Sequence, residues 1–290
     1  MVELISAAEL YSQIQHDSPI STGDPTLDDL LHGGLHPGPV YFFGSPSHLI
    51  SFQVHMLANI IGNVFDAIKS RGLSEELGNI LFIDAENRFD AYLIGKSALE
   101  RHLSPEEVLK HIWVSRAFTW NQIVEILEEK TVHLPVSGIV AIIVFGITRL
   151  YEQTTSGDTS FQLYRDLARM FAGINHVAWH SHSSSSRLPH PLIILTSSQA
   201  SAVNVRKIGG HLFAHYCGVA FHLHDTEQYY QYTLIKHPTL PPQMRVVWKK
   251  GKNPAKMQAK PLDPTKSMWE SMDKYLHPPS SSPFPYVRRV

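Results

Sequence analysis

The chain has 290 residues, 43% of them hydrophobic and 18% charged, which is typical of a globular protein with a sizeable core. The formal net charge is −1 with histidine neutral, so the overall composition favours no polyanionic partner and only local basic patches could bind one. The single cysteine, Cys217, excludes an internal disulfide and is typical of a reducing compartment. The first residues lack the basic start of a signal peptide, and no run of about 18 residues is apolar throughout, so we expect no membrane segment.

The chain starts with a predicted amphipathic helix over residues 6–15, in which Ser6 and Glu9 have the spacing of a capping box. We therefore assign residues 1–20 to an N-terminal helix and linker. The following segment, residues 21–51, has the layout of the first unit of a nucleotide-binding α/β domain. It predicts a capped short helix, a glycine pair, a strand over residues 40–43 that ends at Gly44, and a long apolar helix from residue 49 to about residue 68.

Gly44 stands where a phosphate-binding loop would begin. Such a loop has the pattern G-x-x-x-x-G-K-[ST], because glycine lets backbone N–H groups face the phosphates, lysine adds positive charge, and the hydroxyl holds Mg²⁺. Counting from Gly44, Leu49 replaces the second glycine, Ile50 replaces the lysine, and only Ser51 is retained. We interpret the segment as a phosphate site that has lost its chemistry; the alternative is that Gly44 merely ends a strand.

The rest of the core alternates predicted strands and helices. The strands are uninterrupted apolar runs, which indicates a parallel sheet covered on both faces. Beyond residue 210 the strands are closely spaced and joined by turns, which favours antiparallel pairing. We expect strands over residues 79–83, 111–115, 139–144, 192–196, 219–224, 228–235 and 245–249, and helices over residues 88–101, from 104 onward, 120–130 and 160–171.

Two other segments carry predictions. Histidines 176, 180, 182 and 190 surround a serine-rich run over residues 180–186, which we expect to be a mobile loop. Cysteine and nearby carboxylates are lacking there, so we expect no metal site. Residues 251–290 are predicted to be a C-terminal extension, helical over residues 264–276 and, because the end is rich in serine and proline, partly disordered.

Six short motifs in a fixed order resemble the RecA/RadA recombinase family, in particular the ATPase core of archaeal and eukaryotic strand-exchange proteins and their paralogues. The similarity covers about residues 21–249. It implies an α/β fold over residues 21–250, a RecA-like P-loop NTPase core with a mostly parallel twisted sheet, flanking helices and antiparallel C-terminal strands. The motifs lie at residues 21–35 (STG, LDDLL, GGL), 83–89 (IDAENRF), 115–118 (SRAF), 196–199 (TSSQ), 208–212 (IGGHL) and 233–241 (TLIKHP, LP).

The sequence departs from the family at both nucleotide motifs. Ile50 replaces the Walker A lysine, and Phe145 replaces the Walker B aspartate that would hold Mg²⁺. Glu86 matches the family's catalytic glutamate, and Gln199 matches the residue that senses the γ-phosphate. Phosphoryl transfer depends on positioning and on charge neutralisation, and both neutralising groups are missing. We therefore expect no ATP or Mg²⁺ cofactor and no enzyme activity, with Gly44, Ser51, Glu86 and Gln199 as vestiges. Glu86 is interpreted as a solvated turn acid or a contact between subunits.

Two basic segments are candidates for binding single-stranded DNA. Arg206 and Lys207 lie in the segment from Gln199 to Gly209, which matches the family's DNA-binding loop. Residues 245–260 contain six basic residues and no acid, a composition that attracts phosphate, and an aromatic side chain among them could stack on a base. The DNA-binding candidates in the second segment are Trp248, Lys249, Lys250 and Lys252. The alternative for this segment is a solvated strand end with the tryptophan in the core.

Three functions remain open at this point. The first is a non-catalytic recombinase paralogue in the nucleus, or in the cytoplasm of an archaeon, that binds other RecA-type subunits as an accessory factor in homologous recombination and DNA repair. Neighbouring subunits of this family touch through the ATP face, so an inactive face can still serve as a protein interface. The second is a structural subunit of another assembly, like the RecA-like accessory subunits of Elongator. The third is a weak ATPase that uses Gly44, Ser51 and Glu86.

Overall fold

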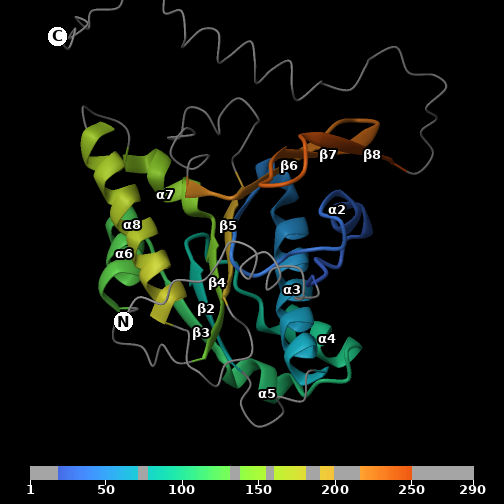
Figure 1. Cartoon of the computed structure of the whole chain (residues 1–290), viewed down its shortest axis with the longest axis horizontal. Coiled ribbons are helices and arrows are strands. Elements are labelled where there is room, and N and C mark those ends of the chain that lie inside the picture. Colours follow the sequence, from blue (N-terminus) through green and yellow to red (C-terminus); the bar gives the residue numbers. More distant parts are fainter. Residues whose placement is uncertain are drawn as a thin grey trace, which may run out of the picture.

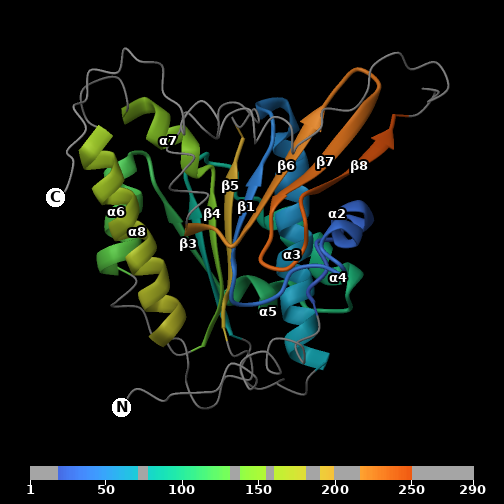
Figure 2. The same cartoon turned by 45° about the horizontal axis from the view of Figure 1, so that its top comes forward.

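The computed structural model describes residues 19–70, 78–130, 138–154, 160–180, 190–198 and 216–249. These residues contain a sheet of eight strands that runs between two layers of helices (Figures 1 and 2). The strands are β1 (Val40–Gly44), β2 (Asn79–Asp84), β3 (Ile112–Arg116), β4 (Ile139–Phe145), β5 (Leu192–Ser197), β6 (Val219–Asp225), β7 (Tyr229–Lys236) and β8 (Gln243–Trp248). Their order across the sheet is β3-β2-β4-β5-β1-β6-β7-β8.

The sheet confirms the predicted fold class. From β3 to β6 in sheet order every pairing is parallel, whereas β7 pairs antiparallel with both β6 and β8. All seven residues of β4 are buried, because successive side chains point to opposite faces and both faces are covered. Ile143 thus packs in one hydrophobic cluster, while its neighbours Ile142 and Val144 pack in the other.

The helices form one layer on each face of the sheet. One cluster packs under α2 (Pro25–Leu30), α3 (Ile50–Ser70), α4 (Ala91–Glu100) and α5 (Pro105–Lys110). The other packs under α6 (Trp120–Glu125), a π-helical turn η2 (Ile126–Lys130), α7 (Ile147–Thr154) and α8 (Ser160–His180). Figure 2 shows α6 and α8 on one side of the sheet, with α3 and α4 on the other.

Several helix boundaries differ from the sequence prediction. Helix α4 begins at Ala91 rather than at residue 88, because the Asp90 carboxylate accepts hydrogen bonds from the backbone N–H groups of Tyr92 (2.9 Å) and Leu93 (3.0 Å). Helix α8 continues to residue 180 rather than ending at 171, since Ile174 is still fully buried against the sheet. The predicted helix over residues 120–130 changes to π geometry at residue 126, and helix α7 was not predicted.

The opening motif is held together by its own polar side chains. The Asp28 carboxylate accepts hydrogen bonds from the hydroxyls of Ser21 (2.6 Å) and Thr22 (2.7 Å) and from the backbone N–H of Thr22 (2.8 Å). Gly34 has a φ of +132°, and a Cβ there would lie 2.4 Å from the Ile20 carbonyl oxygen. The motif therefore requires a residue without a side chain where the chain folds back on residue 20.

Several predictions lie outside the described residues: the helix over residues 6–15, most of the loop over residues 180–186, and the extension over residues 251–290 with its helix over residues 264–276. Within the described ranges, no helix is long and apolar enough to span a membrane. In the same part of the chain, the model contains no group of three or more His, Cys, Asp or Glu side chains suited to a metal ion.

Candidate functional site

The segment in the place of the phosphate loop is a short helical turn. After Gly44 the chain passes through Ser45, whose N–H donates to the carbonyl oxygen of Ser197 (2.9 Å), and enters the 3-10 turn η1 (Ser47–Leu49). Leu49 and Ile50 are half-buried and pack against the hydrophobic cluster beneath α3. The side chain at the lysine position therefore belongs to the core and has no donor to offer a phosphate oxygen.

The carboxyl end of β4 is also apolar. Phe145 is fully buried, and its ring centroid lies 6.3 Å from that of Phe82 on the neighbouring strand β2. These rings line a hollow between α3 and the sheet, together with apolar side chains of α3 and the charged residues Arg88 and Asp90. The position at which the family resemblance implies a Walker B aspartate thus holds a fully buried aromatic ring, and a carboxylate buried there would be costly to desolvate.

Glu86 is not a solvated turn acid, so that interpretation is wrong. Its side chain is 8% exposed, and one carboxylate oxygen accepts a hydrogen bond from the Ser198 hydroxyl. The carboxylate fits because residue 146 is a glycine with a φ of +78°, and a Cβ there would lie 2.1 Å from Cγ of Glu86. The turn itself is held by Asp84, which accepts from the N–H groups of Glu86 (3.1 Å) and Arg88 (2.8 Å).

A buried glutamine on α3 joins the turn after β1 to strand β5. The Gln53 side-chain amide donates to the Ser45 hydroxyl (2.9 Å) and to the carbonyl oxygen of Ser197 (2.8 Å). The Ser197 hydroxyl in turn lies 2.5 Å from that of Thr148 on α7. Gln53 is 2% exposed, and its own side-chain oxygen has no hydrogen-bond partner among the described residues.

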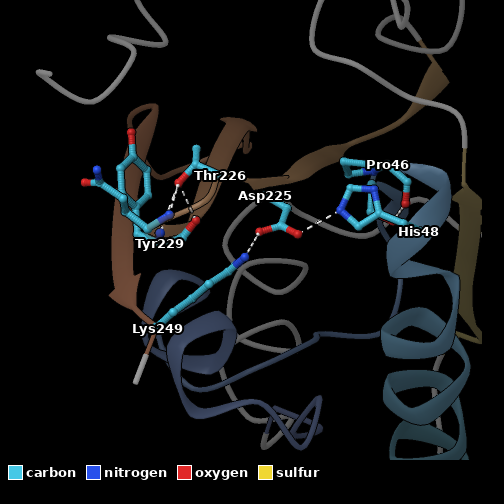
Figure 3. Close-up of polar contacts among 8 residues, drawn as sticks. Pro46, His48, Asp225, Thr226, Tyr229 and Lys249 are labelled. Atoms are coloured by element: carbon cyan, nitrogen blue, oxygen red, sulfur yellow. Dashed lines mark hydrogen bonds and ion pairs between the residues drawn. The ribbon is translucent and has the colours of Figure 1, made fainter. Parts of the chain in front are cut away.

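The turn η1 is also connected to the antiparallel strands by charge. Asp225, at the end of β6, lies between His48 of η1 and Lys249 after β8, with N···O distances of 2.7 Å to each (Figure 3). Partial burial would raise the pKa of Asp225, but the hydrogen bonds and charges of Lys249 and His48 outweigh it and the pKa is lowered. The hydrogen bond to Asp225 raises the pKa of Lys249.

The structure places two of the DNA-binding candidates. The Trp248 ring packs edge to face on Tyr229, with centroids 5.4 Å apart. Lys249 lies over the ring of Tyr230, 4.7 Å from its centroid, and its charge is paired with Asp225. The positive charge of this segment is therefore partly neutralised within the chain. The other DNA-binding candidates, and the residue expected to match the family's γ-phosphate sensor, lie outside the described residues. They are Arg206, Lys207, Lys250 and Lys252, and Gln199.

Sequence reasoning missed Gln53, His48 and Asp225. Gln53 carries no motif, and its partner Ser197 is 144 positions away. Asp225 is separated from His48 by 177 positions. The register of β1 between β5 and β6, which brings Gly44 beside Ser197 and His222, is what places these groups together, and no local pattern reveals it.

The sheet order, the helices on both faces and the turn after β1 define a RecA-like α/β core. The model of the Rad51 family matches residues 15–249, and the chain belongs to that family. It is also similar to the DNA repair and recombination protein RadA of Ignicoccus hospitalis, with 24% identity over 230 residues. That match covers 75% of this chain and 66% of RadA, so the chain spans slightly less than two thirds of its relative.

Proposed function

We propose that this chain is a non-catalytic paralogue of the Rad51 family that acts as an accessory subunit in homologous recombination and DNA repair, in the nucleus or in the cytoplasm of an archaeon. It binds other RecA-type subunits, and it contacts single-stranded DNA through Arg206 and Lys207. Family membership supports the role in recombination and repair. The proposed loss of catalysis rests on one observation. Apolar side chains, Ile50 and Phe145, occupy the two positions whose side chains would help to neutralise phosphate charge in an active member of the family.

The other groups of the site support the same proposal. Glu86 could orient an attacking water only if its carboxylate were directed at a bound phosphate, and it accepts a hydrogen bond from Ser198 instead. Lys249 brings positive charge near the turn, but Asp225 lies between it and His48 and would repel a phosphate. We therefore propose that neither ATP nor Mg²⁺ is a cofactor.

The edge of the sheet at β3 supports the binding of another subunit. Strand β3 pairs only with β2 among the described strands, so its outer N–H and C=O groups face away from the sheet. Three apolar side chains on or beside it are exposed: Trp113 (44%), Val114 (41%) and Phe118 (67%). An unpaired edge with exposed apolar side chains is suited to the addition of a strand from a partner.

Nucleotide assays test the catalytic part of the proposal. We expect the purified chain to show no saturable binding of a fluorescent ATP analogue with Mg²⁺ and no hydrolysis above the protein-free rate. Glu86→Gln is the matched variant, because it keeps the size of the side chain and removes the carboxylate. Turnover in the wild type that Glu86→Gln abolishes would show that the chain is a weak ATPase.

Affinity purification from the native cell tests the partner. We expect RecA-type recombinase or paralogue subunits to be retained by the wild type and lost with Phe118→Glu, which places a charge beside β3. Tyr92→Glu is the control, since Tyr92 is 89% exposed and belongs to α4 rather than to β3 or the residues that follow it. Recovery of tRNA-modifying subunits instead, with no change in DNA-damage sensitivity on deletion, would identify a structural subunit of an Elongator-like assembly.

A further inference from the structure

The carboxyl ends of four neighbouring strands are joined by buried polar side chains. These side chains come from the turns after β1 and β2, from the end of β5, and from α3 and α7, and each is at most 8% exposed. Each forms a hydrogen bond to another residue of this set except Thr196, whose hydroxyl accepts from the N–H of Gly146 after β4. We call this set the strand-end network; it consists of Ser45, Gln53, Glu86, Thr148, Thr196, Ser197 and Ser198.

The strand-end network connects the elements that a nucleotide would connect in a P-loop protein. There, phosphate oxygens and Mg²⁺ bridge the loop after the first strand to groups at the ends of neighbouring strands. Here Gln53 bridges the turn after β1 to β5, and Thr148 bridges α7 to β5. Ser198 extends the connection to Glu86 after β2. The side chains of the chain itself thus complete the bridge.

Two features show that the bridge is built into the fold. Gly146 donates its N–H to the Thr196 hydroxyl (3.0 Å), and its lack of a side chain leaves the space that Glu86 fills. Ser45 donates its N–H to the Ser197 carbonyl oxygen (2.9 Å), which fixes the turn against β5. Hydrogen bonds between buried polar groups favour a single conformation over alternatives, and among the described residues only the Gln53 side-chain oxygen of this network has no partner.

We infer that the strand-end network substitutes for a bound nucleotide and holds this chain in one conformation that does not depend on nucleotide. Glu86 is then a structural acceptor for Ser198 rather than a catalytic group. The inference rests on the proposed loss of nucleotide binding and goes beyond it. It states that the site has an internal replacement, so the folded state neither needs nor responds to MgATP or MgADP.

The experiment compares thermal unfolding and amide hydrogen exchange of the full chain with and without millimolar MgATP or MgADP. For the wild type we expect no shift of Tm and no change in exchange with either nucleotide. Gln53→Ala removes two hydrogen bonds and should lower Tm by roughly 4–8 °C and speed exchange at the N–H of Ser45 by about tenfold. His55→Ala is the control on the same helix, because His55 is exposed and its hydrogen bond, to the Ser51 carbonyl oxygen (2.7 Å), stays within α3.

Glu86 variants separate the structural role from a catalytic one. Glu86→Gln keeps an oxygen that accepts from Ser198, so we expect exchange in the peptide containing Ser198 to stay at the wild-type rate. Glu86→Ala removes the acceptor and should raise that rate about tenfold. If Gln53→Ala does not fold, Thr148→Val tests the same network with almost no change in volume, and we expect it to speed exchange near Ser197.

The outcomes separate the two proposals. A clear rise of the wild-type Tm with MgATP would overturn both the proposed loss of nucleotide binding and this inference. If nucleotide changes neither Tm nor exchange in the wild type, and exchange in Gln53→Ala, Glu86→Ala and Thr148→Val stays at the wild-type rate, the inference is overturned and the proposed loss of nucleotide binding stands. Indifference to nucleotide with faster exchange in these three variants and wild-type exchange in Glu86→Gln would support it.

Discussion

An aspartate at position 145, where the family resemblance implies the Walker B aspartate, should destabilise the protein without giving it nucleotide binding. Phe145→Asp removes a fully buried ring that packs against Phe82, at a cost of about 3–5 kcal/mol for the loss of the aromatic side chain alone. It also buries a carboxyl group beside the apolar side chains of α3, and the desolvation of that group adds about 1–3 kcal/mol. We expect a total loss of at least about 4 kcal/mol, or a fall of Tm of roughly 8–16 °C.

Urea and thermal unfolding followed by circular dichroism measure this loss, and a fluorescent ATP analogue measures nucleotide binding in the same preparations. Phe145→Leu is the matched control, because it keeps the position apolar and should cost clearly less than Phe145→Asp. The reasoning would be refuted if Phe145→Asp were as stable as Phe145→Leu, or if it gained saturable MgATP binding while Ile50 remained in place.

Three further predictions concern other groups. Burial, and after it the electrostatic effect of His36, lower the pKa of His237 in the folded state. The free energy of unfolding should therefore not depend on His237 above its unfolded pKa of about 6.5, and should decrease as the pH falls below that value. His237→Asn should remove this contribution to the pH dependence of stability, as measured by urea titrations at several pH values. Asp225→Asn should cost less than about 1 kcal/mol, because its ion pairs are partly exposed, and by freeing Lys249 it should tighten binding to labelled single-stranded DNA. Asp24→Ala removes the N-cap of α2 and should cost about 1–2 kcal/mol in unfolding experiments, with Asp24→Asn close to the wild type.

Much of the fold could be predicted because its signals are local. Apolar runs identified the parallel strands, and the spacing of β6, β7 and β8 indicated their antiparallel pairing. The helix expected from residue 104 onward is α5, with Ser104 as its N-cap and Pro105 as its first residue. The C-terminal end of α8 could not be predicted in the same way. Its second half is stabilised by the burial of Ile174 in the core, and this contact is not evident from the local sequence.

Only the motif positions of the candidate site could be predicted from the sequence. The substitutions at residues 50 and 145 were visible by position, since a motif fixes their spacing. The hydrogen bonds of Gln53 and Glu86 were not visible, because their partners Ser197 and Ser198 lie at and just after the end of β5, and these contacts depend on the strand order. Glu86 was misinterpreted for the same reason: its burial depends on Gly146 and Ser198, both far from it in the chain.

The position of β1 in the middle of the sheet determines when this protein can fold during its synthesis. Among the described strands β1 leaves the ribosome first, yet its two neighbours are β5 and β6, which begin at residues 192 and 219. Until those residues emerge, an apolar strand and the helix behind it have no partner on either side, and a chain of this kind relies on slow, long-range pairing. Nonsense mutations before residue 219 should therefore yield insoluble fragments rather than a smaller folded domain.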